Sequence, residues 1–223
     1  MDPYAAKRDR MVSEQIAARG IRDERVLDAM RRVPREEFVL RNSRASAYED
    51  HPLPIGDGQT ISQPYIVALT VEAARVDETS SVLDVGTGSG YAAAVMAEIA
   101  GDIVSIERHE GLASAASRVL ERLGYSNVTV VVGDGTLGWP DAAPYDAIVA
   151  AAAAPRVPAP WLDQVRVGGR LVMPVGTPGF GQRLQRITRT DGTPRVDDLG
   201  GVTFVPLIGA HGVGAPMFEE RDD

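Results

Sequence analysis

Residues Ser81-Val82-Leu83-Asp84-Val85-Gly86-Thr87-Gly88-Ser89-Gly90 decide the fold class. The first five form a short apolar run that is typical of a buried strand, and the glycines permit a tight turn into a helix. The spacing is Gly-x-Gly-x-Gly, whereas a dinucleotide fingerprint is Gly-x-Gly-x-x-Gly. Asp84 would repel a pyrophosphate and attract an ammonium group. The stretch therefore favours a cationic cofactor, although it could also be only a tight strand-to-helix turn.

From Ser81 onward, strands and helices alternate. This rhythm predicts an α/β fold with a doubly wound, Rossmann-like and mostly parallel sheet, preceded by an N-terminal helical extension. We expect strands at 81–85, 103–107, 128–132, 147–150 and 170–175, and helices at 91–100, 110–123 and 161–165. Residues 182–188 and 202–208 alternate like antiparallel edge strands, and we expect the acidic tail ending at Asp223 to be mobile.

The first 75 residues predict helices at 9–19, 23–32 and 63–74, separated by an irregular loop at 42–62. Asp23 is the expected cap of the second helix, and Gly20 and Pro34 are expected ends. Long loops in compact domains are often functional. We expect one domain, residues 1–223, with a helical region and active-site loop (1–75), a cofactor-binding core (80–176) and C-terminal strands (180–210).

The composition excludes several classes of protein. The chain has 223 residues, no cysteine and three histidines, so disulfides and thiolate catalysis are excluded and a metal site is not expected. A formal net charge of -8 argues against nucleic-acid binding. No apolar run reaches the ~20 residues of a membrane span, and the N-terminus lacks a secretory pattern. We expect a cytoplasmic monomer without a membrane or nucleic-acid partner.

Two more acids follow the next expected strands, namely Glu107 and Asp134, and Gly135 follows the second. The carboxyl ends of parallel strands form the edge at which ligands bind. Glu107 can accept hydrogen bonds from ribose hydroxyls, and Asp134 from an adenine amino group, with Gly135 leaving room for the ring. Together with Asp84 they predict S-adenosylmethionine as cofactor. Singly, each could be a turn residue or a solvated strand end.

The chain resembles the protein-L-isoaspartate O-methyltransferase family. The most specific segment is Leu53-Pro54-Ile55-Gly56-Asp57-Gly58-Gln59-Thr60-Ile61-Ser62-Gln63-Pro64, and further matching pieces lie at 33–39, 133–135, 145–148, 168–176 and 204–207. The resemblance implies an S-adenosylmethionine-dependent methyltransferase fold and isoaspartate-containing proteins and peptides as partners. It implies methylation of the α-carboxylate of L-isoaspartyl residues; the ester then cyclises to a succinimide, which hydrolyses partly to aspartate.

The resemblance also places the active-site serine at Ser62, which could alternatively cap the helix that follows. The expected cofactor-binding residues are Gln59, Thr60, Ile61, Asp84, Gly86, Thr87, Gly88, Ser89, Gly90, Glu107, Asp134 and Gly135. The expected substrate-binding residues are His51, Ile61, Ser62, Ala151 and Ala152. Relatives commonly have Glu at position 84 and often have arginine near position 51. The alanines could simply be tight packing at a strand end.

The chemistry suits these residues. A carboxylate is ionised at neutral pH and needs no general base, so Ser62 would only aim it at the methyl group by donating a hydrogen bond. Three other readings remain: a carboxyl methyltransferase acting on ordinary aspartate or a small acid, a binding protein that has lost catalysis, and an NAD-dependent enzyme. The intact acids and Ser62 disfavour the second, and the glycine spacing disfavours the third.

Overall fold

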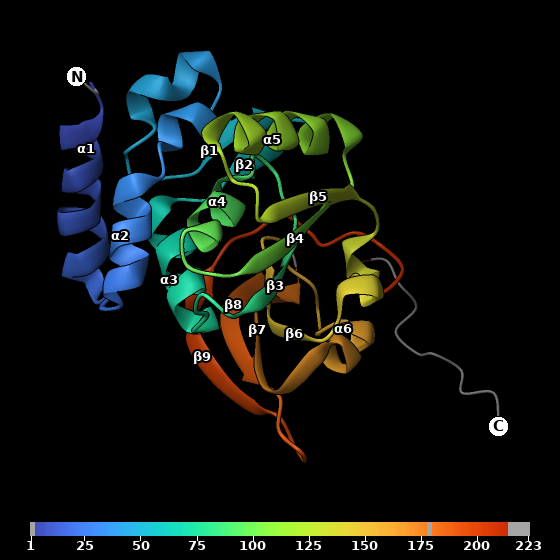
Figure 1. The fold of residues 1–223 in the computed structure, drawn as a ribbon. Helices are drawn as coiled ribbons and strands as arrows, with labels where there is room; N and C mark the ends of the chain where they lie inside the picture. The colour runs from blue at the N-terminus through green and yellow to red at the C-terminus, as the bar shows by residue number, and fades with distance from the viewer. Residues whose placement is uncertain (1–2, 178–179, 214–223) are drawn as a thin grey trace.

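The computed structural model describes residues 3–177 and 180–213, and its centre is a seven-stranded sheet of order β5-β4-β3-β6-β7-β8-β9. The first five strands of this order run parallel to one another (Figure 1). Strand β8 pairs antiparallel with β7, and β9 pairs antiparallel with β8. The strands are β3 (Ser81–Val85), β4 (Asp102–Glu107), β5 (Val128–Val132), β6 (Tyr145–Ala150), β7 (Val165–Thr177), β8 (Phe180–Thr188) and β9 (Arg195–Val202). The expected doubly wound, Rossmann-like and mostly parallel sheet is confirmed.

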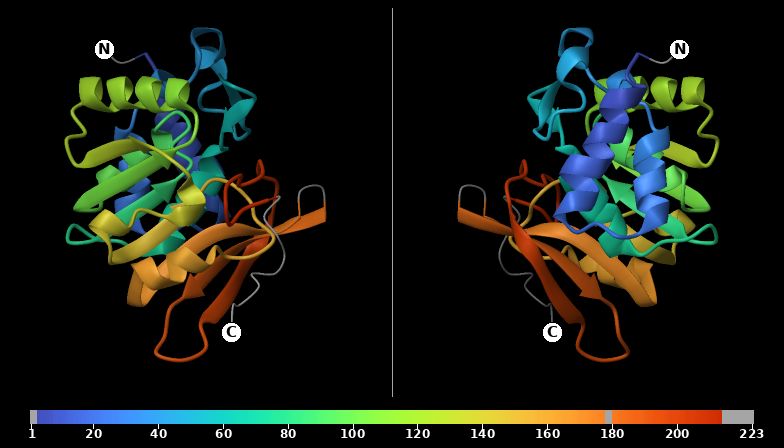
Figure 2. Two further views of the ribbon diagram at one scale, coloured as in Figure 1. Left: turned by 90° about the vertical axis from the view of Figure 1, so that its right-hand side faces the viewer. Right: turned by 90° about the vertical axis from the view of Figure 1, so that its left-hand side faces the viewer.

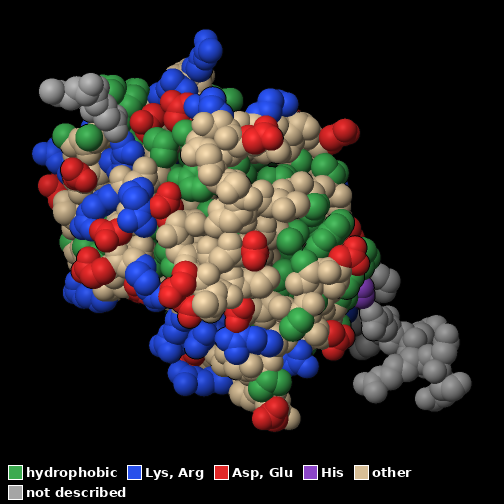
Figure 3. All heavy atoms as spheres, in the orientation of Figure 1, with side chains coloured by type: hydrophobic (Ala, Val, Ile, Leu, Met, Phe, Trp, Pro, Cys, Tyr) green, Lys and Arg blue, Asp and Glu red, His purple; other side chains and the backbone are tan. Residues whose placement is uncertain are grey.

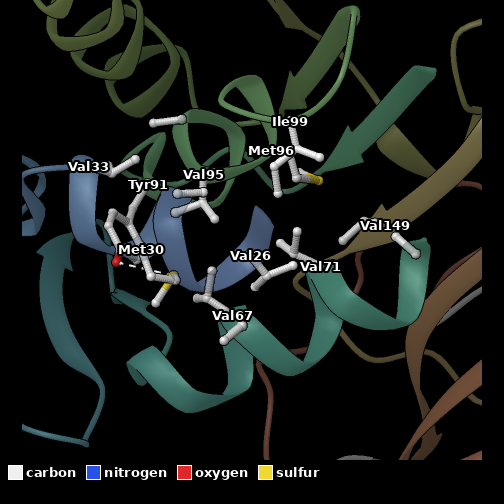
Figure 4. Close-up of a cluster of buried hydrophobic side chains, with 14 of the residues drawn as sticks. Val26, Met30, Val33, Val67, Val71, Tyr91, Val95, Met96, Ile99 and Val149 are labelled. Atoms are coloured by element: carbon white, nitrogen blue, oxygen red, sulfur yellow. Dashed lines mark hydrogen bonds between the residues drawn. The ribbon is translucent and has the colours of Figure 1, made fainter. Parts of the chain in front are cut away.

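Helices cover both faces of the sheet. Val82 and Leu83 alternate between two apolar clusters because successive strand residues point to opposite faces. The helices α3 (Pro64–Ala74), α4 (Tyr91–Ala97) and α5 (Glu110–Leu123) contribute to one cluster, and α6 (Ala159–Gln164) contributes to the other through Trp161. Figure 4 shows Val67 and Val71 of α3 facing Val95 and Met96 of α4 across the first cluster.

The N-terminal region packs outside this helical layer (Figures 1 and 2). Helix α1 (Ala5–Arg10) continues as a π-helical stretch (Met11–Ile16) and a 3-10 turn (Ala17–Arg19), which ends at Gly20 with a φ of 104°. Helix α2 (Glu24–Arg32) has the expected cap, because Asp23 accepts a hydrogen bond from the Arg25 amide at 3.0 Å. Val26 and Met30 of α2 are buried in the same cluster as α3 and α4.

The prediction of an irregular loop at 42–62 is wrong in its second half. Strands β1 (Leu53–Gly56) and β2 (Gln59–Ile61) form an antiparallel hairpin after two 3-10 helices, Arg35–Phe38 and Arg41–Ser46. Asp57 and Gly58 make the turn with positive φ angles of 50° and 69°. The hairpin forms despite its turn-prone composition because Leu53, Ile55 and Ile61 are buried against the core.

The C-terminal strands also differ from the prediction. Strand β7 begins at Val165, and the partner of β8 is 195–202 instead of 202–208. A short connection after β8 allows the next segment to return as a hairpin, which extends beyond the helical layers (Figure 2). Residues 203–208 instead run beside 151–154, with a parallel bridge between Ala153 and Pro206. Most of the expected mobile tail lies outside the described residues.

Candidate active site

Three connected spaces lie at the carboxyl edge of the parallel strands. The inner pocket has a volume of about 240 Å³. Its walls are the hairpin residues 58–60, the glycine turn at Gly86 and Gly88, the end of β4 at 107–109, Gly135, Ala151, Ala152 and residues 205–208. This edge is where ligands bind in open parallel sheets. The inner pocket is therefore the natural place for a cofactor.

The outer cleft is larger, about 890 Å³, and more open. Pro52, Ser62 and Ile66 form one side, and residues 181–182 and 201–205 of the β8–β9 region form the other. Thr60, Ala151 and Val205 line both the outer cleft and the inner pocket. A molecule in the cleft therefore lies beside a molecule in the inner pocket.

A small compartment of about 30 Å³ completes the site. Ser62 and Asp84 both line it, together with Thr70 of α3, Phe204 and Ala151. Ala151 is thus a wall residue of all three spaces. The arrangement brings the expected catalytic serine and the expected counter-charge of the cofactor to one place.

Asp84 is 1% exposed and sits at the end of β3 with one satisfied and one unsatisfied oxygen. Its Oδ2 accepts a hydrogen bond from the Ser105 hydroxyl at 2.7 Å, whereas Oδ1 has no partner among the described residues. Burial raises the pKa of Asp84 from 3.8 to about 6. An unsatisfied buried carboxylate oxygen costs free energy, and an ammonium group would remove that cost.

Glu107 ties the glycine turn to β4. Its Oε2 accepts from the Gly88 amide at 2.9 Å and its Oε1 from the His109 amide at 3.0 Å. The side chain is 5% exposed and lines the inner pocket. Each carboxylate oxygen can accept more than one hydrogen bond, so contact with a ribose is compatible with this geometry and stays a prediction.

Asp134 is placed differently from Glu107. Its Oδ1 accepts from the amide and hydroxyl of Thr136, at 2.9 and 2.7 Å, and its Oδ2 accepts from the Ala210 amide at 2.8 Å. It is Gly135 that lines the inner pocket. Asp134 thus holds the chain after residue 208 in place, and its contact with adenine stays a prediction.

The residues of the glycine turn have separate tasks. Gly86 and Gly88 line the inner pocket, whereas Gly90 lies against α5, where an added Cβ would meet Leu120 Cδ1 at 3.3 Å. The Thr87 hydroxyl is buried and lies 2.6 Å from the Ser105 hydroxyl. Ser89, also expected to bind cofactor, is half-buried beside the turn. Cofactor contact by the side chains of Thr87 and Ser89 stays a prediction.

Ser62 does not cap α3. The helix begins at Pro64, and its N-cap residue is Gln63, whose side chain accepts no capping hydrogen bond. Asp50, which is distant in sequence, caps the helix instead. Its Oδ1 accepts a hydrogen bond from the Tyr65 amide and its Oδ2 accepts one from the Gln63 side chain, each at 3.1 Å. The Ser62 carbonyl accepts from the buried Arg35 guanidinium at 2.8 Å. Sequence reasoning missed both Asp50 and Arg35.

We expect Asp50→Ala to lower the free energy of unfolding by about 1–2 kcal/mol, as loss of a helix cap does. Urea denaturation would measure it. Asp50→Asn is the matched control, because its one oxygen still accepts from the Tyr65 amide, whereas its amide nitrogen can neither accept from the Gln63 side chain nor pair with Arg19. If Asp50→Ala left stability unchanged while Ser62→Ala reduced it, Ser62 would be the cap after all.

His51 lies beside the outer cleft. Its ring nitrogens bond the Pro52 carbonyl and the Glu49 carboxylate, both at 2.9 Å, and these two contacts raise its pKa. Pro52 lines the cleft. Substrate contact by His51 itself stays a prediction.

Segment 203–208 is the main part of the site that sequence reasoning placed wrongly. The Gln182 amide holds it: Nε2 donates to the Phe204 carbonyl at 3.0 Å and Oε1 accepts from the Phe204 amide at 2.6 Å. The Leu207 amide donates to the Ala153 carbonyl at 2.7 Å. The resemblance to the family includes residues 204–207, but the alternating pattern of 202–208 predicts an edge strand.

The pattern of the protein-L-isoaspartate(D-aspartate) O-methyltransferase family matches residues 6–212. The chain belongs to this family. A protein-L-isoaspartate O-methyltransferase 2 from Pelobacter propionicus is 58% identical, with 92% of each chain covered. A protein-L-isoaspartate O-methyltransferase 1 from Rhodopseudomonas palustris is 54% identical over 99% of this chain and 90% of its own.

Solved structures of the family agree. A protein-L-isoaspartate O-methyltransferase superimposes with a TM-score of 0.84 at 31% identity, covering 92% of this chain and 67% of its own. A Plasmodium falciparum protein described as a family member, in complex with S-adenosyl-L-homocysteine, gives 0.77 at 25% identity, covering 90% and 98%. Within residues 3–177 and 180–213, no helix has the length and apolar character to cross a membrane.

Proposed function

We propose that the three connected spaces carry out this family's reaction, the transfer of a methyl group from S-adenosylmethionine to the α-carboxylate of an L-isoaspartyl residue. One observation supports the assignment of the site above the others: Ser62 and Asp84, whose Oδ1 has no partner among the described residues, line one small compartment that shares Ala151 with the inner pocket and the outer cleft. Donor and acceptor can therefore meet beside Ala151, which lines all three spaces.

The inner pocket fits the cofactor by the chemistry of its groups. Beside this pocket, Asp84 lines the small compartment, and its Oδ1 is a buried anionic acceptor without a partner among the described residues, which matches an ammonium group. Glu107 would accept from the ribose, and the glycines at 86 and 88 bring backbone close to the ligand. When bound, S-adenosylmethionine supplies an electrophilic methyl group on a sulfonium.

Ser62 would orient the acceptor. Its side chain lines the outer cleft and the small compartment, so its hydroxyl can donate to one oxygen of an incoming carboxylate while the other oxygen faces the inner pocket. Arg35 fixes the Ser62 backbone from behind. Orientation of this kind can contribute roughly 7–11 kcal/mol to lowering a barrier.

The outer cleft would take the peptide. Segment 201–205 offers backbone along one wall, and backbone hydrogen bonds accept many side-chain sequences, as a repair enzyme requires. The small side chains of Ala151 and Ala152 leave room where cleft and pocket meet. The hairpin residues Gln59, Thr60 and Ile61 would cover the cofactor side.

The decisive measurement uses radiolabelled S-adenosylmethionine and a pair of peptides that differ only in isoaspartyl or aspartyl linkage. We expect the isoaspartyl peptide to be methylated at least about 100-fold faster, because only its free α-carboxylate reaches the position beside Ser62. The alternative predicts a different pattern: a methyltransferase for ordinary aspartate would label the aspartyl peptide at least as fast as the isoaspartyl one, and an enzyme for a small acid would label neither.

We further propose that the chain acts as one domain and as a cytoplasmic monomer. One apolar cluster joins Met11 of the N-terminal region to Leu184 of β8, which supports a single domain. On the face shown in Figure 3, basic side chains gather toward the left and lower edges with acidic side chains among them, and few lie over the centre, which disfavours nucleic acid as a partner. Light scattering of the purified protein would test the monomer.

A further inference from the structure

Three side chains form a hydrogen-bonded chain beneath the glycine turn. Ser105 lies at its centre on β4 and is fully buried. Its hydroxyl donates to Asp84 Oδ2 at 2.7 Å and lies 2.6 Å from the Thr87 hydroxyl. A serine hydroxyl has one hydrogen, and Asp84 receives it, so the Thr87 hydroxyl must donate to Ser105. The chain therefore has a fixed direction, from the glycine turn to Asp84.

This direction depends on the charge of Asp84. A proton on Oδ2 would reverse the chain and leave the Thr87 hydroxyl hydrogen without an acceptor in the part of the protein that the structure describes. A proton on Oδ1 would keep the chain but would itself lack an acceptor there, since Oδ1 has no partner. Either protonated form leaves a buried donor unsatisfied, which is costly. The ionised form satisfies both hydroxyls.

The other groups around Asp84 do little to stabilise its negative charge. Around the small compartment, α3, α4 and β6 contribute the uncharged residues Thr70, Ala92 and Val149. On β4, the charged group that acts on Asp84 is Glu107, and its negative charge opposes ionisation, as burial does. Among the residues that the structure describes, Ser105 is the one contact that favours the carboxylate form of Asp84. Without it, Asp84 would be neutral over a wider range of pH.

We propose that Ser105 is a positioning residue of the cofactor site: its hydroxyl, backed by Thr87, holds Asp84 ionised with Oδ1 directed to the cofactor's ammonium group. This inference rests on the proposed function, in which Asp84 is the counter-charge of that group. Thr87 lies in the glycine turn between Gly86 and Gly88, which both line the inner pocket. The hydrogen bonds from Thr87 through Ser105 thus connect the carboxylate of Asp84 to the glycine turn beside the inner pocket.

The test is calorimetric titration of S-adenosylhomocysteine, which keeps the ammonium group, between pH 5 and pH 8.5. We expect Ser105→Ala to move the midpoint of the affinity–pH curve up by about one unit, and to weaken binding about sixfold at pH 6.5 but only about twofold at pH 8.5. Thr87→Val should move the midpoint in the same direction by a smaller amount. This second variant keeps the direct hydrogen bond between Ser105 and Asp84. Ser80→Ala, at a buried serine that bonds Asp77 instead, should leave the midpoint unchanged.

Two results separate this inference from the proposed function. If Asp84→Asn weakens binding but neither Ser105→Ala nor Thr87→Val moves the midpoint, Ser105 is structural and the inference is overturned alone, even if the melting temperature falls. If Asp84→Asn binds S-adenosylhomocysteine with wild-type affinity and pH dependence, the role of Asp84 fails and the inference fails with it.

Discussion

Asp84→Asn should weaken binding of S-adenosylmethionine about 50-fold at pH 8. The variant keeps the shape of the side chain but removes the negative charge at the unsatisfied Oδ1. A hydrogen bond to a charged group contributes about 1.5–3 kcal/mol, which corresponds to roughly 10- to 150-fold in affinity. Isothermal titration of the purified variant would measure the change, with turnover of an isoaspartyl peptide followed at saturating cofactor.

The same variant should make the cofactor-free protein more stable at pH 8. Burial raises the pKa of Asp84 from 3.8 to about 6, so the folded state disfavours the ionised form. The contribution of Asp84 to stability is therefore greatest below pH 3.8 and is lost as the pH rises through 6. Removing the charge should recover about 3 kcal/mol at pH 8 and almost nothing at pH 4. Urea denaturation at both pH values would measure this.

Wild-type affinity for the cofactor should follow the opposite trend. Binding of a cation favours ionised Asp84, so affinity should fall as the pH drops below about 6 and level off above it. Asp84→Asn should show neither dependence. A variant with reduced affinity but unchanged stability at both pH values would mean that Asp84 is not buried in the free protein as the structure has it.

Ser62→Ala should reduce turnover about 100-fold while cofactor affinity and melting temperature stay close to wild type. The hydroxyl aims the acceptor, and misplacement of a reacting group by about 1 Å can cost this much. Stability should not change, because Asp50 satisfies the Tyr65 amide and the N-cap side chain makes no bond. Single-turnover kinetics with an isoaspartyl peptide would separate the chemical step from binding.

Ser62→Thr is the matched variant, because it keeps a hydroxyl and should recover part of the activity. Equal activity of Ser62→Ala and the wild-type protein would exclude the orienting role. A joint fall in turnover, cofactor affinity and melting temperature would instead show that the serine supports the structure of the loop.

Much of the architecture follows from local sequence. The run 81–85 and the valine-rich 128–132 are strands with the predicted bounds, and Asp23 caps α2 as expected. The strands' carboxyl ends carry Asp84 and Glu107, which the parallel topology brings together. Periodicity and glycine spacing are enough here because each element's own residues determine its form.

The remaining features depend on contacts that are distant in sequence. Pro54 and Gly56 disfavour a strand locally, and the hairpin forms because its apolar side chains are buried by other parts of the chain. Asp50 caps a helix that begins well after it in the sequence, which no capping pattern predicts. Segment 203–208 alternates like a strand, yet it runs beside 151–154, because residues 195–202 already pair with β8.

The walls of the inner pocket come from opposite parts of the chain: residues 58–60 early, and residues 205–208 late. During synthesis on a ribosome, the early hairpin and the glycine turn emerge long before the last wall. A nascent chain therefore lacks a complete inner pocket for the methyl donor until residue 208 has left the ribosomal exit tunnel. Catalytic competence would thus appear abruptly late in translation, after nearly all of the sheet can already have assembled.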